Sequence, residues 1–149
     1  VGYSTLYGDM CGGFSVVKDI YKSDLYKLSE WRNENLPSFS AIKAKEVIPK
    51  NIISKEPTAE LKEDQKDSDS LPPYDVLDKI LYLLVEKESS INDIISKGYE
   101  PSLVTKVQNL LYNSEYKRRQ AAPGVKISER NFGYDRRYPI TNAFRDKEK

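Results

Sequence analysis

The sequence predicts a mainly α-helical chain with one hydrophobic core. Apolar residues recur at helical spacing in three stretches, residues 17–31, 77–84 and 103–111, and a proline adjoins each of them. The length of 149 residues accommodates one modest domain and is too short for two comfortable ones. No internal repeat interrupts this pattern.

The first helix is expected to run from Val17 to a point before Pro37, because proline cannot continue a helix. Its apolar positions are Val17, Ile20, Tyr21, Leu25, Leu28 and Trp31. Ahead of it, residues 1–15 combine glycines with aromatic residues, which suits either a turn-rich connection or close approach to a ligand. Residues 38–53 have a mixed pattern that predicts no single element.

Residues 54–73 form the most polar segment, in which acids alternate with lysines. Almost nothing in this segment can be buried, so we expect a mobile loop, either a plain linker or a lid over a site. Thr58 lies at its start and has two interpretations. Its hydroxyl can donate to a phosphate or bind a metal, or it can cap a helical turn.

After this loop, the pattern predicts a cluster of three helices whose apolar stripes form the core. Pro73 opens the first, Ser89 or Ser90 caps the second ahead of Gly98, and Pro101 starts the third. The core positions are Leu77, Ile80, Leu81, Leu84, Ile91, Ile94, Ile95, Leu103, Val107, Leu110 and Leu111.

The segment from Ser114 to Arg145 is basic and aromatic, and its glycines and prolines exclude a single helix. Its cations are Lys117, Arg118, Arg119, Lys126, Arg130, Arg136, Arg137 and Arg145, and its aromatic residues are Tyr116, Phe132, Tyr134, Tyr138 and Phe144. Guanidinium groups match phosphate oxygens, and flat rings stack on bases. The segment is therefore either a surface for a phosphorylated aromatic ligand or a solvated basic tail beside core tyrosines.

Overall composition restricts the chemistry. The net charge is +1, which favours a discrete anion site over general affinity for nucleic acid. The chain has no histidine, which excludes imidazole catalysis and most transition-metal sites. The single Cys11 predicts a reducing, cytoplasmic setting. No apolar run approaches the roughly 20 residues that cross a bilayer, so no membrane partner is expected.

Several charged residues could serve a site, although none is singled out by charge alone. Asp9, Asp19 and Glu60 could act as acids or hold Mg²⁺, but each is expected to face solvent. Lys18 and Lys22 lie four residues apart in the expected helix and would share a face, where they could contact one anion.

Three motifs, in this order, resemble the NAD synthetase family, most closely its long, glutamine-dependent type. They are LYGDMCGGFSVVKD at 6–19, KEPTAELKEDQKDSDSLPPYDVLD at 55–78 and EYKRRQAAPGVKISERNFGYDRRYPITN at 115–142. The resemblance covers nearly the whole chain.

This resemblance implies an α/β parent fold of the adenine nucleotide α-hydrolase type with a parallel sheet. Within it, residues 1–149 would be the C-terminal part of the synthetase domain, mainly helical with one or two short strands, and residues 54–73 its mobile active-site loop. It also implies a ligase reaction in which ATP, with Mg²⁺, adenylylates deamido-NAD. Ammonia derived from glutamine then displaces AMP to give NAD, with release of pyrophosphate.

Site residues follow from the resemblance position by position. Lys22 and Thr58 match ATP-binding residues of the family, and Lys117 matches the lysine at the deamido-NAD phosphates, with Arg118 beside it. Residues implied to line the deamido-NAD pocket are Tyr3, Ser4, Thr5 and Leu6. Asp9 belongs to the shared Gly-Asp turn and has a supporting role. No catalytic residue and no metal ligand is assigned.

The chain also departs from the family pattern. Tyr116 stands where short, ammonia-dependent members have a histidine, and Leu6 and Gly13 replace a lysine and an aspartate beside the Gly-Asp turn. The Ser-Gly-Gly-x-Asp-Ser pyrophosphate loop is not among these 149 residues. We therefore expect a fragment of a longer enzyme that needs the remainder of the synthetase chain, is inactive alone and self-associates as a homo-oligomer. The alternatives are a nucleotide- or RNA-binding remnant without catalysis, or a structural dimerisation piece.

Overall fold

The computed structural model describes residues 1–8, 10–58 and 63–147. Its elements are α1 (Lys22–Glu34), α2 (Lys50–Ser54), the 3-10 helix η1 (Asp67–Asp69), α3 (Tyr74–Val85), α4 (Ile91–Ile95), α5 (Pro101–Asn113) and α6 (Glu115–Gln120). In place of a strand, the described residues contain only an isolated parallel bridge between Ser15 and Gly124. The expectation of one or two short strands is therefore wrong for this part of the chain, because its extended segments meet at one residue pair only.

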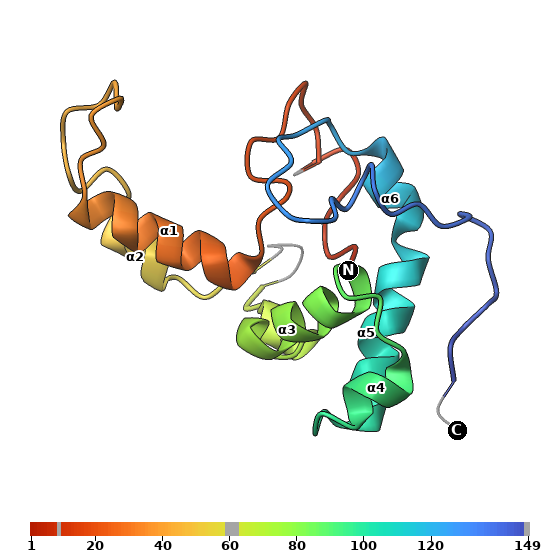
Figure 1. The fold of residues 1–149 in the computed structure, drawn as a ribbon. Coiled ribbons are helices and arrows are strands. Elements are labelled where there is room, and N and C mark those ends of the chain that lie inside the picture. Colours follow the sequence, from red (N-terminus) through yellow and green to blue (C-terminus); the bar gives the residue numbers. More distant parts are fainter. Residues whose placement is uncertain (9, 59–62, 148–149) are drawn as a thin grey trace.

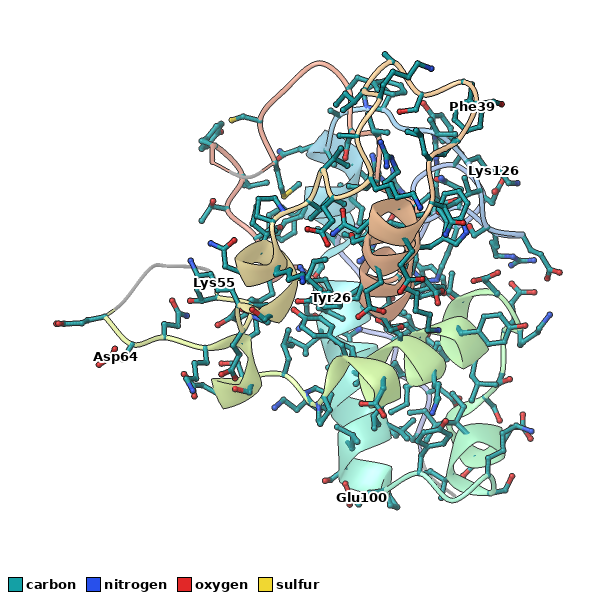
Figure 2. The ribbon with its side chains drawn as sticks, turned by 90° about the vertical axis from the view of Figure 1, so that its left-hand side faces the viewer. Tyr26, Phe39, Lys55, Asp64, Glu100 and Lys126 are labelled. Carbon is teal, nitrogen blue, oxygen red and sulfur yellow. The ribbon has the colours of Figure 1, made fainter. Side chains whose placement is uncertain are left out.

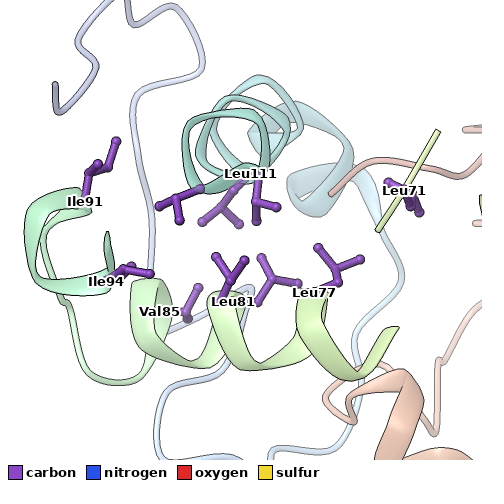
Figure 3. Close-up of a cluster of buried hydrophobic side chains, with 10 residues drawn as sticks. Leu71, Leu77, Leu81, Val85, Ile91, Ile94 and Leu111 are labelled. Carbon is purple, nitrogen blue, oxygen red and sulfur yellow. The ribbon is translucent and has the colours of Figure 1, made fainter. Parts of the chain in front are cut away.

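The core lies between α3, α4 and α5, whose apolar side chains point toward one another (Figure 3). Apolar residues with an exposed fraction of 1% or less are Leu77, Ile80, Val85, Ile91, Ile94, Val104, Val107 and Leu111. Burying each such side chain stabilises the fold by about 1.5–3 kcal/mol relative to leaving it in water. The predicted three-helix cluster is confirmed.

Local signals set the ends of the core helices. The Ser90 hydroxyl accepts a hydrogen bond from the Asp93 amide at 3.1 Å, and the Asp93 carboxylate accepts from the Ser90 amide in return. This reciprocal cap starts α4, and Gly98, at φ +94°, ends the turn that follows it. The Glu100 carboxylate caps α5 by accepting from the amides of Ser102 and Leu103.

The first helix differs from its prediction. It begins at Lys22 instead of Val17, although it ends at Glu34, before the proline as expected. Residues 15–19 follow a non-helical path because two hydrogen bonds tie them to the chain after α6. The Ser15 amide donates to the Pro123 carbonyl at 2.8 Å, and the Asp19 carboxylate accepts from the Ile127 amide. No residue of α1 is buried, so its apolar stripe does not belong to the core.

Helices α1 and α2 lie side by side and extend away from the α3–α6 body (Figure 1). The loop between them folds around Arg32, whose guanidinium donates to the carbonyls of Asn35, Ala44 and Lys45 at 3.0–3.1 Å. At the outer edge of this loop, the Phe39 side chain is 89% exposed (Figure 2).

The polar segment 54–73 contains more buried structure than its composition predicts. Leu71 packs against the core with 6% exposure, and Asp67, with 8% exposure, accepts a hydrogen bond from the Tyr74 hydroxyl. Most of the described residues of this segment are exposed as expected, and Leu71 and Asp67 are the buried exceptions. Residues 59–62, including Glu60 and the helical turn that Thr58 was expected to cap, lie outside the described residues.

After α6 the chain is irregular and folds back, so that residues 121–133 lie beside the N-terminal segment (Figure 1). This confirms that the basic segment is not one helix.

Candidate functional site

A cavity of about 520 Å³ lies between the N-terminal segment, the start of α1, α3 and α6. The polar side chains around it come from Ser4, Ser15, Lys18, Lys22, Asp78, Ser114, Lys117 and Arg118, and the aromatic ones from Phe14, Tyr21, Tyr74 and Phe132. A cavity with cations and aromatic rings on its walls suits a phosphorylated ligand that carries flat rings.

Lys22, the first residue of α1, lies on one wall of this cavity. Its ammonium group lies 5.7 Å from the centroid of the Tyr26 ring and 5.9 Å from that of the Tyr74 ring. Aromatic faces attract a cation without occupying its hydrogen-bond donors. Lys22 is therefore held beside the cavity with donors left for an anion.

Lys117, on α6, lies on another wall and also has a structural role. Its Nζ donates to the carbonyl oxygens of Gly2 and Ser4, at 2.6 Å each. An ammonium group has three donors, so one remains for a ligand in the cavity. Gly2 itself lies against this helix, because a β-carbon on it would lie 2.1 Å from the Ser114 hydroxyl oxygen.

Arg118 reaches the same cavity and is anchored by Glu115, which is only 2% exposed. The Glu115 carboxylate lies 2.8 Å from Arg118 and 3.2 Å from Arg119. Burial by itself would raise the pKa of Glu115, but these arginine partners outweigh it and hold the pKa below its ordinary value. The carboxylate is therefore charged and fixes the orientation of Arg118.

The predicted segment Tyr3–Leu6 is only partly at the cavity. Ser4 lines it, whereas Tyr3, Thr5 and Leu6 are not among its lining residues. The Tyr3 hydroxyl instead accepts a hydrogen bond from Gln65 at 2.8 Å, and the Thr5 carbonyl accepts from the amides of Gly8 and Met10. Asp9 lies outside the described residues.

Thr58 is described and partly exposed, but it is not one of the residues that line the cavity. The neighbouring Pro57 carbonyl accepts from the Asp67 amide at 2.9 Å. The Asp67 carboxylate in turn accepts a hydrogen bond from the Tyr74 hydroxyl, and the Tyr74 ring lies beside Lys22. The start of the 54–73 segment is therefore connected to Lys22, on the cavity wall, through Asp67 and Tyr74.

Lys18 and Asp19 form hydrogen bonds to the tail, the segment after α6 (residues 121–147), and are therefore not free charges. Lys18 precedes α1, so it does not share a helix face with Lys22 as predicted, although both residues line the cavity. Its Nζ donates to the Ala122 carbonyl at 2.7 Å, and burial lowers the pKa of Lys18.

Asp19 is 4% exposed, so the expectation that it faces solvent is wrong. Its Oδ2 atom accepts three hydrogen bonds at 2.8 Å, from the Ile127 amide and from the amide and hydroxyl of Ser128. Burial would raise the pKa of Asp19, but these hydrogen bonds outweigh it and lower the pKa. A charged Asp19 therefore holds the tail beside the cavity.

Most arginines of the basic segment 114–145 bind protein groups. Arg136 is 7% exposed and lies 4.1 Å above the Tyr138 ring, which stacks on Tyr112 at 4.9 Å. Arg119 donates to the Tyr138 carbonyl, and Arg145 donates to the side chains of Asn109 and Asn113 on α5. The solvated-tail interpretation is therefore wrong for the buried Arg136, and Arg119 and Arg145 are hydrogen-bonded within the fold. The candidate anion site is thereby limited to the cations that line the cavity.

Asp78 and Tyr74 line the cavity on α3 but were not singled out in the sequence. Asp78 is 8% exposed, and its Oδ2 accepts from the amide and hydroxyl of Ser23 at 2.8 and 2.7 Å. Asp78 is a charged residue beside the apolar stripe of α3, and this position is the sequence signal that could have identified it as a site residue.

Two further findings concern the described residues alone. Nowhere among them do three or more histidine, cysteine or acidic side chains gather as metal ligands. None of their helices is both long and apolar enough to cross a membrane.

Comparison with known proteins identifies the family. Residues 1–121 match the family model of NAD synthase. The chain is 53% identical over 145 residues to the glutamine-dependent NAD(+) synthetase of Xylella fastidiosa strain 9a5c, covering 97% of this chain and 25% of that protein. It is 50% identical to the corresponding synthetase of Thermotoga maritima, covering 97% of this chain and 24% of that protein.

A solved structure is also similar, that of the glutamine-dependent NAD+ synthetase from Acinetobacter baumannii in complex with ADP. It superimposes with a TM-score of 0.51 at 43% identity, covering 99% of this chain and 24% of that one. The present chain thus spans about a quarter of the length of these relatives. Since the family model matches most of its residues, the chain belongs to the NAD synthase family.

Proposed function

We propose that this chain is the C-terminal portion of the synthetase domain of a glutamine-dependent NAD synthetase. In this reaction, deamido-NAD, ATP and ammonia released from glutamine give NAD, AMP and pyrophosphate through an adenylylated intermediate. The observation that carries the proposal is that Lys22 of α1 and the neighbouring Lys117 and Arg118 of α6 line one cavity together with Ser4. The ADP complex of the Acinetobacter baumannii relative supports a nucleotide ligand for this family.

The cavity cations suit a reaction between two anionic substrates. We assign Lys22 and Thr58 to ATP and Lys117, Arg118 and Ser4 to deamido-NAD. Cations from α1 and α6 around one cavity offset the repulsion between the two sets of phosphates and hold the reacting groups together. Tyr3, Thr5 and Leu6 would support the pocket indirectly, through the segment that Lys117 anchors.

The reaction also needs groups that lie beyond this set of residues. The pyrophosphate loop of the family is not in the sequence, and the described residues assemble no acidic metal cluster. We therefore place Mg²⁺ binding and catalysis in the complete enzyme, formed with the remainder of the synthetase chain and as a homo-oligomer in the cytoplasm. Residues 54–73 would be its active-site loop.

A chimera tests this function. In the Xylella fastidiosa synthetase, the matching segment is replaced by residues 1–149, and NAD formation is measured with ATP, deamido-NAD and either ammonia or glutamine. We expect NAD formation with both nitrogen sources, and no turnover by the 149-residue chain alone. A chimera that binds no deamido-NAD, while the unmodified relative is active, would contradict the proposal.

Binding by the chain itself separates a synthetase from a polyanion-binding remnant. Calorimetric titrations with deamido-NAD, ATP and a short RNA are carried out at low and at moderate salt. We expect a saturable preference for deamido-NAD or ATP, because Arg119, Arg136 and Arg145 are occupied within the fold. A preference for RNA with a steep salt dependence would favour the remnant.

A further inference from the structure

We propose that Asp78 is a positioning residue that fixes Lys22 for nucleotide binding by capping α1 from the neighbouring helix α3. This inference rests on the proposed function, in which Lys22 contacts ATP. It assigns a role to a buried carboxylate that the sequence motifs do not single out.

Helix α1 begins without a cap of its own. The residue at its N-cap is Tyr21, whose side chain makes no capping hydrogen bond. The first amides of a helix have no acceptor within the helix and need one from elsewhere. Asp78 supplies it, because its Oδ2 accepts from the Ser23 amide at 2.8 Å and from the Ser23 hydroxyl at 2.7 Å. A carboxylate from another helix thus does what serine or aspartate usually does at the N-cap.

The same link determines where Lys22 lies. Ser23 follows Lys22 directly, so fixing the Ser23 amide also fixes the backbone from which the lysine extends. Lys22 is otherwise located by the rings of Tyr26 and Tyr74, and these contacts are weakly directional. A second link from Tyr21 to Glu86 at 3.0 Å ties the same end of α1 to the far end of α3.

Asp78 is suited to this role because it is rigid. It is 8% exposed and directly follows Leu77 on α3, a core residue that is 1% exposed. Both Asp78 and Lys22 line the 520 Å³ cavity, so the carboxylate acts from within the site. The core of the protein therefore sets the position of an ATP-binding cation through one carboxylate oxygen.

Kinetics in the chimera test this role. Asp78→Ala is expected to raise the KM for ATP by about tenfold or more, since a displacement of about 1 Å can cost up to about 100-fold. The kcat and the KM for deamido-NAD should change much less, because a binding contact is lost and no reacting group is moved. Asp78→Asn keeps an acceptor oxygen, and asparagine caps about as well as aspartate, so it should restore most of the ATP affinity.

Asp75→Asn is the matched control, because it removes the same charge from an exposed position on the same helix. Equal effects of Asp75→Asn and Asp78→Ala, or an unchanged KM for ATP in Asp78→Ala, would overturn the proposal. If Asp78→Ala does not fold, Ser23→Ala decides, because it removes one of the two hydrogen bonds and should give a smaller rise in the KM for ATP. An unchanged KM in that variant counts against the role.

Amide exchange in the 149-residue chain tests the cap without any dependence on catalysis. Ser23 is the second residue of α1, so its amide should be protected only because of Asp78. We expect this protection in the wild type and in Asp78→Asn, and its loss in Asp78→Ala. An inactive wild-type chimera with a protected Ser23 amide would count against the proposed function, whereas an unprotected amide in the wild type would overturn the cap itself.

Discussion

Ser15 and Gly124 face each other in a parallel backbone bridge, and a β-carbon on residue 124 would lie 2.4 Å from the Ser15 carbonyl oxygen. The same β-carbon would lie 2.9 Å from Cβ of Lys18. This contact joins the segment before α1 to the tail after α6. Because Ser15, Lys18 and Ala122 all line the cavity, the bridge also closes one side of the candidate site.

Gly124→Ala is expected to destabilise the fold by about 1–3 kcal/mol, the usual cost of overpacking a close contact. Gly13→Ala is the control, because nothing lies within 4 Å of a β-carbon at that position. Its effect should remain within about 0.5 kcal/mol. Urea unfolding followed by circular dichroism measures both changes. Equal stabilities of the two variants would show that the bridge does not form in solution.

Acidification should release the tail through Asp19. Hydrogen bonds from Ser128 and Ile127 outweigh the effect of burial and lower the pKa of Asp19 in the folded state. A lowered carboxyl pKa stabilises the fold above the unfolded pKa of about 3.9, and this contribution is lost as the pH falls through the folded value. The protection factors of the amides of residues 124–131, which correct for the intrinsic pH dependence of exchange, should therefore fall below about pH 4.

Asp19→Asn removes that titration, so the protection factors of residues 124–131 should be lower than in the wild type at neutral pH and should depend less on pH. Asp24→Asn on the exposed side of α1 is the control. A wild-type profile that stays flat down to the acid limit of folding would contradict the role of Asp19.

Removing Glu115 should be costly because it leaves buried arginines without their carboxylate. Glu115→Ala is expected to destabilise the fold by about 3–5 kcal/mol, as for other broken buried ion pairs. Glu46→Ala removes an exposed carboxylate from a pair with Lys50 and should cost less than about 1 kcal/mol. Chemical denaturation compares the two variants, and similar costs would argue against a buried network.

Lys117→Ala should weaken deamido-NAD binding and also free the N-terminal segment. The Nζ atom binds the Gly2 and Ser4 carbonyls, so its loss removes two hydrogen bonds to charge, each about 1.5–3 kcal/mol. We expect faster amide exchange in residues 2–6 together with lower affinity in calorimetry. Lys106→Ala, an exposed lysine on α5, is the control. Unchanged affinity would remove Lys117 from the site.

Much of the core could be predicted because its signals are local. The apolar stripe of α3, the Ser90 cap and the Pro101 start depend on residues within a few positions of one another, and each appears in the structure as predicted. The start of α1 could not be predicted in this way. It depends on Asp19 and on Ser128, more than 100 residues further along the chain.

For the candidate site, too, some features could be predicted from the sequence and others could not. Residue types and their order were enough to identify the family and to mark Lys22, Lys117 and Arg118, because a phosphate ligand requires cations and these motifs are collinear. Only the tertiary structure decided which charges are available. In the structure, Lys18, Asp19 and most arginines of the basic segment 114–145 hold distant segments of the chain together. Such hydrogen bonds and ion pairs depend on where two distant segments come into contact. The spacing of residues along one segment contains no information about that contact.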